Sequence, residues 1–497
     1  MNTPTGVPVV MTADRTLMAD HRTVFGGMVA SSQTTTVPWP LMDHLLAPRP
    51  RLPVAPLGLR RIEASLLADG FETDEVAVVE AERLESVIGR DTRIVAVSAG
   101  EACGLGMNST TMTAITGGEI YPRRLVNNLM RRIRELRSSA PDAKVILGGP
   151  GAWQFVADND LRARLGVDHV VSGQAEGNVA EVFGGVISGD GLPTVIEGAP
   201  VGASAIPAIR GPSAMGVVEL SRGCGLGCEY CVMGRERMAH LPEETILADV
   251  RTNVEAGLSS IAAISEDMLR YAGDGVRPSP ERLLGLLAKM RQVEGLDLIQ
   301  TDHANVMSVA GWSDEQLRNL RGLMVGDSGS RYPWMNLGVE SASGELLARS
   351  GSAKLGGVEP SDWGAFAAEQ LRRLIRAGFM PMASLILRLP GECGDDVQRS
   401  LDWVDGLAGE PLMIFPMLYA PIDGSPPPTR NDLTRAHWRL IERCYGFNFR
   451  EVPRMFFDGQ TAAGVPVGRR LALQALGFGQ VALWSALFAW RGWQAER

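Results

Sequence analysis

Three of the six cysteines, Cys224, Cys228 and Cys231, lie within eight residues of one glycine-rich loop. The glycines between them relax the backbone, so the three thiolates can converge on a single metal centre. A structural zinc ion usually takes four protein ligands, whereas a cubane iron–sulfur cluster held by three cysteines keeps one iron open. An open metal position is where a substrate or cofactor is activated. The loop therefore predicts a catalytic centre; the alternatives are a zinc loop completed by a distant ligand such as His240, or three ordinary cysteines.

The rest of the composition is that of a globular protein with more than one domain. The 497 residues are too many for one ordinary core, and 45% of them are hydrophobic and 21% charged. A formal net charge of −9 gives no electrostatic reason to expect nucleic acid or an anionic membrane as a partner. The N-terminus lacks the pattern of a secretion signal, and clustered cysteines in a long chain favour a reducing compartment. We expect a cytoplasmic protein.

The first part of the chain alternates short apolar runs with helical patterns. Residues 76–79, 94–98 and 144–147 are apolar runs, and residues 125–136 have helical periodicity with arginines on the polar side. A glycine turn follows the third run, as is typical of a doubly wound α/β fold. We therefore predict a Rossmann-like domain over residues 1–195, followed by a Gly- and Pro-rich linker over 196–213.

A second, more regular alternation begins after the linker. Its six candidate strands are residues 216–220, 260–265, 296–301, 335–339, 381–387 and 412–417. Six β/α repeats predict an incomplete parallel barrel over residues 214–421, with its chemistry at the carboxyl ends of the strands. Residues 422–497 read as a small helical region.

The helical region contains one long uncharged stretch, from Leu471 to Trp490, with arginines on both sides. Its length is about that needed to span a bilayer. Two glutamines and two glycines dilute its apolar character, so we favour a buried C-terminal helix. A helix that binds a membrane surface or a partner is the alternative.

The cysteine triplet, with Tyr230 before its last member and at the end of the first strand of a partial barrel, resembles the radical S-adenosylmethionine (SAM) superfamily. The resemblance implies a [4Fe-4S] cluster whose open iron chelates the amino and carboxylate groups of SAM. One electron then breaks a C–S bond, and the 5′-deoxyadenosyl radical abstracts hydrogen from the substrate. It also implies that the backbone carbonyl of Tyr230 accepts a hydrogen bond from the adenine amino group.

Later strand ends also match this superfamily. Asp267, in Ser-Glu-Asp after the second strand, stands where relatives keep a polar motif near the SAM amino group. Glu340 and Ser341, in Gly-Val-Glu-Ser after the fourth strand, resemble the element that reaches the SAM ribose or carboxylate. Residues 385–392 resemble the adenine-pocket element, although Arg388 replaces its usual glycine. Alternatively, Asp267 and Glu340 simply cap the helices that follow.

An α/β domain before such a barrel is similar to the cobalamin-binding arrangement of a radical SAM subgroup. Gly148 and Gly149, and a Gly-Glu-Gly type turn at 172–177, carry this likeness and make cobalamin a candidate cofactor. The Asp-x-His-x-x-Gly element that supplies a cobalt ligand is absent. The insertion at 103–118 has two interpretations. It lines the domain interface, or it is an ordinary surface loop.

The resemblance implies radical hydrogen abstraction from a small metabolite, with cobalamin-assisted C-methylation as the leading outcome. Cobalamin-independent dehydration, epimerisation or rearrangement of a sugar-type intermediate is one alternative, and a non-catalytic Fe–S or zinc module is another. Asp302 and His303, after the third strand, are candidate substrate-binding residues. Flavodoxin or ferredoxin is the expected electron donor, docked near Arg222, Arg235 and Arg237. Neither nucleic acid nor membrane is an expected partner.

Overall fold

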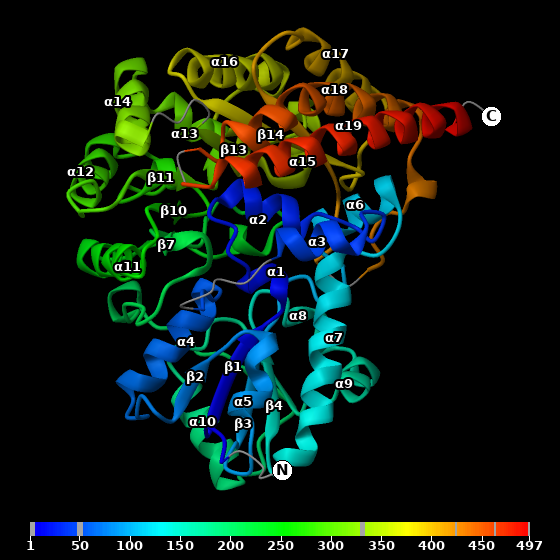
Figure 1. The fold of residues 1–497 in the computed structure, drawn as a ribbon. Coiled ribbons are helices and arrows are strands. Elements are labelled where there is room, and N and C mark those ends of the chain that lie inside the picture. Colours follow the sequence, from blue (N-terminus) through cyan, green and yellow to red (C-terminus); the bar gives the residue numbers. More distant parts are fainter. Residues whose placement is uncertain (1–4, 47–52, 329–332, 423–424, 462–463, 496–497) are drawn as a thin grey trace.

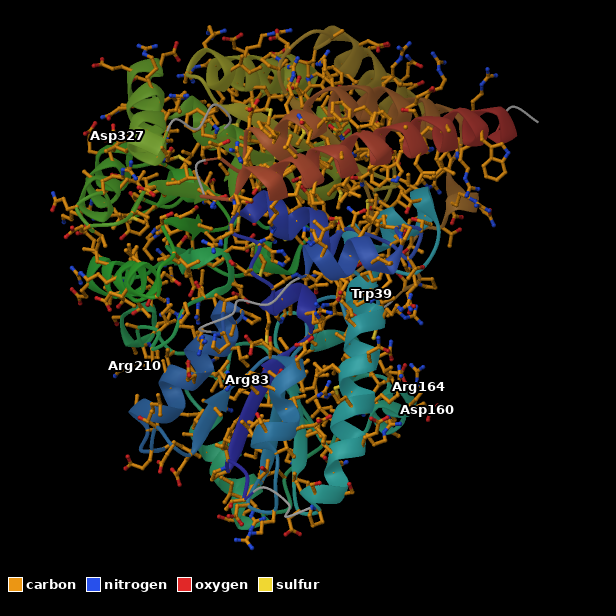
Figure 2. The ribbon with its side chains drawn as sticks, in the orientation of Figure 1. Trp39, Arg83, Asp160, Arg164, Arg210 and Asp327 are labelled. Carbon is orange, nitrogen blue, oxygen red and sulfur yellow. The ribbon has the colours of Figure 1, made fainter. Side chains whose placement is uncertain are left out.

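The computed structural model describes residues 5–46, 53–328, 333–422, 425–461 and 464–495. Figure 1 shows the N-terminal sheet and its helices at the bottom, the barrel above them, and the C-terminal helices across the top. In Figure 2, Asp160 and Arg164 project from the edge of the N-terminal part, away from its sheet.

The N-terminal sheet has six parallel strands in the order β2-β1-β3-β4-β5-β6. They are β1 (Val9–Ala13), β2 (Val76–Val78), β3 (Ile94–Ser98), β4 (Lys144–Gly148), β5 (His169–Ser172) and β6 (Val195–Glu197). Alternate residues of each strand face opposite sides, and a separate apolar cluster covers each side. This confirms the predicted doubly wound α/β fold.

The helices of this part cover both faces of the sheet and also reach the barrel. They are α1 (Arg15–Met18), α2 (Val24–Ser31), α3 (Trp39–Leu45), α4 (Leu57–Ala68), α5 (Leu84–Val87), α6 (Met107–Thr116), α7 (Tyr121–Leu136), α8 (Trp153–Val156), α9 (Asn159–Leu165) and α10 (Val179–Ser188). The predicted helix at 125–136 is the greater part of α7. Between β6 and the barrel, the backbone carbonyls of Pro207 and Pro212 accept hydrogen bonds from Arg61 and Arg60 of α4.

The six predicted barrel strands form two parallel sheets, ordered β11-β10-β7 and β12-β13-β14-β15. The strands are β7 (Val217–Glu219), β10 (Ser260–Ile264), β11 (Leu298–Thr301), β12 (His303–Asn305), β13 (Trp334–Glu340), β14 (Met380–Leu387) and β15 (Met413–Leu418). The third predicted strand, 296–301, corresponds to β11, and a break at Asp302 separates it from the unpredicted strand β12. The Asp302 carbonyl accepts a hydrogen bond from Asn336 N at 2.9 Å. The structure confirms a partial barrel.

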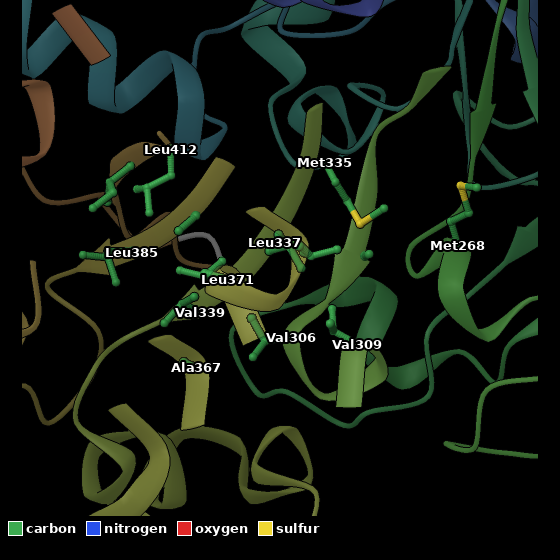
Figure 3. Packing of buried hydrophobic residues seen from close by; sticks show 14 of the residues in the cluster. Met268, Val306, Val309, Met335, Leu337, Val339, Ala367, Leu371, Leu385 and Leu412 are labelled. Atoms are coloured by element: carbon green, nitrogen blue, oxygen red, sulfur yellow. The ribbon is translucent and has the colours of Figure 1, made fainter. Parts of the chain in front are cut away.

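Seven helices follow the barrel strands: α11 (Glu243–Glu255), α12 (Pro280–Met290), α13 (Val306–Ala310), α14 (Asp314–Val325), α15 (Gly344–Gly351), α16 (Trp363–Arg376) and α17 (Gly394–Gly406). Their apolar faces pack on the outside of the strands. Figure 3 shows Leu337 and Val339 of β13 close to Leu371 of α16. A short antiparallel pair, β8 (Ser221–Arg222) and β9 (Ala239–His240), flanks the cysteine loop.

Two helices from the N-terminal part close the open side of the barrel. Phe25 of α2 packs in one cluster with barrel residues Trp334 and Met380. Met112 of α6 belongs to the main barrel core, and Thr111 Oγ1 of the same helix accepts a hydrogen bond from Leu418 N at 2.7 Å. Sequence elements separated by some 300 residues therefore build one shared core.

The chain ends in a hairpin of two helices, α18 (Arg435–Phe457) and α19 (Val467–Ala495). Aromatic pairs hold them together, including Tyr445 and Phe488 with ring centroids 4.9 Å apart. The predicted C-terminal helix is present, but the prediction that it is buried was wrong. Only 17% of the most apolar window of α19 is buried, and the segment Val467–Phe488 is long and apolar enough to cross a membrane by length and composition.

Candidate functional site

One cavity of about 860 Å³ joins the barrel to the N-terminal sheet. Its wall includes Cys224, Cys228 and Cys231 on the barrel side. On the other side it includes Ser98, the last residue of β3, and Pro150, just after β4. The volume lies at the upper end of the range for small-ligand pockets, about 300–1,000 Å³. The cavity therefore connects both places where α/β folds usually bind ligands.

Backbone hydrogen bonds fold the cysteine loop into a compact turn. Gly223, Gly225 and Gly227 have φ values of 73°, 71° and 67°, which favour glycine over any other residue. The Cys224 amide donates to the carbonyl of Met233 at 3.2 Å, and the Gly227 amide donates to that of Gly234 at 2.9 Å. The glycines thus allow the tight loop that brings three thiols to one wall.

The donor set of this wall fits an iron–sulfur cluster with a bound cofactor. Within the described residues no three His, Cys, Asp or Glu side chains are arranged around a single metal ion, whereas a cubane cluster takes each of three cysteine thiolates on a different iron. Burial raises the pKa of the Cys224 and Cys231 thiols, and a cluster would replace their protons. The buried hydroxyl of Tyr230, on the same wall, has no well-oriented hydrogen-bond partner in the described part of the chain. A polar ligand in the cavity would satisfy it.

Arg270 is a charged side chain in direct contact with the first cysteine, and no sequence motif pointed to it. Its Nη2 lies 2.7 Å from the Cys224 carbonyl oxygen and 3.3 Å from Cys224 Sγ. Asp267 is fully buried and holds Arg270 Nε at 2.9 Å, while Ser308 Oγ donates to the same carboxylate at 2.5 Å. Asp267 therefore acts on the loop through Arg270.

The cavity wall contains Glu266 and not Asp267. The predicted direct contact between Asp267 and SAM does not agree with this geometry, because its carboxylate is enclosed by Arg270, Ser308 and the Asn305 amide. Adjacent residues at a strand end point in opposite directions. The motif alone therefore could not show whether Glu266 or Asp267 faces the cavity.

Glu340 lies on the cavity wall at the end of β13, with a φ of 64° at a register shift in the strand. Such a conformation is costly for a residue other than glycine and is typical of functional sites. Its carboxylate accepts hydrogen bonds from Lys354 Nζ at 2.6 Å and Ser384 Oγ at 3.2 Å. Burial alone would lower the pKa of Lys354, but the Glu340 carboxylate raises it, so Lys354 keeps its positive charge. No sequence motif pointed to Lys354.

Ser341, unlike the neighbouring Glu340, points away from the cavity. Its hydroxyl accepts from the Ser343 amide at 3.0 Å and its carbonyl accepts from Trp363 Nε1 at 2.8 Å. The side chain is buried and does not line the cavity. Ser341 therefore has a local structural role before α15, which does not agree with its predicted contact with SAM.

Asp302 and His303 both line the cavity, where β11 passes into β12. His303 Nδ1 lies 3.1 Å from Asp302 Oδ2, and its Nε2 lies 2.9 Å from Asn336 Nδ2. Burial alone would lower the pKa of His303, but the Asp302 carboxylate raises it to about 9. The pair can hold a proton at His303 within the cavity.

The predicted cofactor glycines of the N-terminal sheet have close protein neighbours. Gly149 has a φ of 88°, and a Cβ there would lie 2.6 Å from Ser98 Oγ and 2.9 Å from the Ala99 carbonyl oxygen. Gly148 and Gly149 are not part of the cavity wall, whereas Pro150 is. Their contact with a cofactor stays a prediction, because close packing already accounts for Gly149.

The turn at 172–177 contacts the barrel directly. Glu176 and Gln174 accept hydrogen bonds from Arg222 at 2.6 and 3.1 Å, and Glu219 also pairs with this arginine. Arg222 is therefore occupied inside the protein and is not free to dock an electron donor. Arg235 and Arg237 are exposed, as such docking would require.

The insertion at 103–118 contributes Met107, Asn108, Thr111 and Met112 to the cavity wall. The structure thus supports its interpretation as part of the domain interface and excludes an ordinary surface loop.

No protein-family model matches the chain. Among curated proteins, it is 24% identical over 353 residues to the tRNA-2-methylthio-N(6)-dimethylallyladenosine synthase of Cereibacter sphaeroides, covering 66% of this chain and 70% of that protein. The Paracoccus denitrificans enzyme of the same name is 23% identical over 73% of this chain and 76% of its own length. The ribosomal protein uS12 methylthiotransferase of Citrifermentans bemidjiense is 26% identical over 216 residues, 42% of this chain and 43% of that protein.

These relatives correct one prediction. Their names specify tRNA and a ribosomal protein as what they modify, which contradicts a small-molecule substrate and the exclusion of nucleic acid. The negative net charge misled the sequence analysis, because it averages over the whole surface and says nothing of a local patch.

Proposed function

Because the chain belongs to the radical SAM superfamily, whose enzymes use a [4Fe-4S] cluster and SAM, we propose that it transfers a methyl-containing group to a carbon atom of a macromolecular substrate. The cavity that runs from the cysteine loop to the N-terminal sheet carries this proposal. It has room for SAM beside the loop and for a projecting base or side chain, or a second cofactor, beyond it.

Cys224, Cys228 and Cys231 are the residues that would hold the cluster. When bound, the cluster supplies the electron that cleaves SAM to the 5′-deoxyadenosyl radical. Arg270 offsets negative charge beside Cys224, and Asp267 keeps this arginine in place. The Glu340–Lys354 pair presents opposite charges on or next to the cavity wall, and these suit the amino and carboxylate groups of one ligand.

A methyl group is favoured over a methylthio group by the distribution of cysteines. Only Cys103 precedes Cys224 in the sequence, so the N-terminal part cannot hold a second cluster, as a sulfur source, through three thiolates. The order of its sheet and the opening of the cavity at Ser98 and Pro150 suit a corrinoid. Among the described residues His303 is the single histidine on the cavity wall, so the N-terminal sheet would offer the cobalt no histidine.

Methylthio transfer is the second candidate, and the names of the relatives favour it. The two candidates differ in the product, because methylthio transfer adds sulfur to the substrate and methyl transfer does not.

The test is anaerobic reconstitution with iron and sulfide, followed by incubation with SAM, a strong reductant, and either total tRNA or ribosomal proteins. We expect 5′-deoxyadenosine, and a product heavier by one methyl substitution when cobalamin is added. Dependence on sulfide, with sulfur in the product, would establish the second candidate instead. Absence of SAM cleavage in every mixture would refute both.

Single Cys→Ser variants at 224, 228 and 231 should each lose the iron and sulfide, and with them SAM cleavage. The matched control is Cys393→Ser, because Cys393 is exposed and far from the loop in sequence. Full cleavage by the Cys228→Ser variant would contradict the assigned ligands.

A further inference from the structure

The outer face of α19 is apolar apart from Ser485. No charged residue occurs between Arg470 and Arg491. Leu471, Phe478 and Leu483 are 53%, 58% and 52% exposed, and Trp490 near the end is 47% exposed. Twenty helical residues extend over about 30 Å, so this is a long apolar strip and not a scatter of single side chains.

The inner face of the same helix packs against the rest of the protein. Trp484 and Phe488 pack on Tyr445 of α18, and Leu473 and Leu476 pack on clusters that include α2 and α3. The outer strip is therefore not the result of a loosely placed helix. It faces away from a well-packed neighbour.

The helical hairpin that carries this strip is rich in arginine, in contrast to the rest of the chain. Residues 433–491 contain eight arginines and three acidic residues, whereas the whole chain has a net charge of −9. Arg439, Arg443, Arg450 and Arg454 are exposed along α18. Arg443 pairs with the exposed Asp405 of α17, and Arg450 and Arg454 both pair with the buried Glu451. Because α18 packs along α19 (Figure 1), these arginines lie on the helix next to the one that carries the apolar strip.

We propose that α19 lies in the surface of an anionic lipid bilayer, with its outer strip among the acyl chains and the arginines of α18 at the phosphates. Apolar side chains beside a cationic row are the chemistry that such a surface recognises. An RNA would match the arginines but not a strip of leucine, alanine and phenylalanine. A second copy would bring two arginine-rich hairpins together, which disfavours pairing through this face.

The consequence for the active site follows from the position of α19. Gln480, Val481 and Trp484 line the cavity from the inner side of the helix. The bilayer would therefore lie against the outside of the cavity wall, one helix away from the reacting groups.

The test is sedimentation of the full-length, reconstituted protein with vesicles of phosphatidylcholine, with and without phosphatidylglycerol. We expect binding that requires phosphatidylglycerol and weakens with salt. The triple variant Leu471→Ser/Phe478→Ser/Leu483→Ser should bind about tenfold more weakly or less. Arg439→Glu/Arg443→Glu should lose the preference for the anionic lipid.

The matched control is Val276→Ser, which makes the same kind of change at a residue that is 62% exposed on the barrel. It should bind vesicles like the unchanged protein. SAM cleavage by all variants reports that they are folded. Equal vesicle binding by the triple variant and the control would overturn the proposal. So would binding of tRNA in place of vesicles through Arg439 and Arg443, or a dimer that the triple variant dissociates.

Discussion

Charged side chains around the cavity occur in close pairs. Asp267 with Arg270 and Glu340 with Lys354 are buried pairs, whereas His303 and Asp302 stay 48% and 34% exposed toward the cavity. Removing one partner of a buried pair leaves an uncompensated charge, which costs far more than an ordinary surface substitution. Single substitutions here should therefore affect stability as well as chemistry.

Asp267→Asn should lower the free energy of unfolding by about 3–5 kcal/mol, because it removes the charge that faces Arg270. Ser308→Ala removes only a hydrogen bond to the same carboxylate and should cost about 1 kcal/mol. Urea unfolding of the cluster-free proteins measures both. Equal losses of unfolding free energy would mean that the Asp267–Arg270 ion pair contributes no more to stability than the hydrogen bond from Ser308.

The pH dependence of stability should report on His303. Its pKa rises from 6.5 unfolded to about 9 folded, chiefly because of Asp302. Its contribution is thus fully present below about pH 6.5 and is lost as the pH rises through about 9. His303→Gln should remove this part of the fall in Tm at alkaline pH. His169→Gln, on the edge of the N-terminal domain, is the control and should keep the original profile.

At the scale of residues, the sequence predicted which positions lie near the cavity better than it predicted which way their side chains point. The cysteines, Glu340, Asp302 and His303 were located because strand ends of a parallel barrel converge. Asp267 was preferred to Glu266, and Arg270 and Lys354 were missed, because a motif does not state which way a side chain points or what a distant turn brings to it.

At the scale of elements, the bounds of strands and helices agree closely with the sequence patterns. Whether an element is buried could not be predicted as well. The runs at 94–98 and 144–147 became β3 and β4 almost residue for residue. The apolar α19 was predicted to be buried and is largely exposed, because apolar composition does not specify a covering neighbour.

Glycines at the ends of β4 and β5 allow a test of close packing. Gly149→Ala and Gly173→Ala both place a Cβ at a φ near 90°, but only the first meets other atoms. Gly173→Ala should therefore cost about 1–2 kcal/mol from backbone strain alone. Gly149→Ala should cost at least about 1 kcal/mol more, from contact with Ser98 and Ala99. Equal losses in urea unfolding would show that strand-end packing is looser than the structure indicates.

Across the whole molecule, a fully buried ion pair joins the N-terminal part to the barrel. Arg61 of α4 donates to Asp249 of α11 at 2.5 Å and to the Pro207 carbonyl at 2.6 Å. Burial raises the pKa of Asp249 and Arg61 opposes that rise, so the two groups depend on each other.

Arg61→Leu alone should destabilise the protein by about 3–5 kcal/mol, because Asp249 is left buried without its partner. The double variant Arg61→Leu/Asp249→Leu should recover part of that loss. Arg93→Leu is the control, since Arg93 pairs with Asp142 on the surface and should cost about 0–1 kcal/mol. No recovery in the double variant would mean that the interface depends on the Pro207 contact instead.

The hydrogen bond from β15 to α6 has a consequence for dissecting this protein. β15 is the last strand of its sheet, and an uncovered last strand is a template for another chain. Asn448 of α18 pairs with the Ile414 backbone of this strand, and Thr111 of α6 covers its end at Leu418. The barrel expressed without residues 1–195 would therefore keep the first cover and lose the second, which exposes the carboxyl end of the edge. We expect such a truncation to polymerise, and light scattering during refolding would detect it.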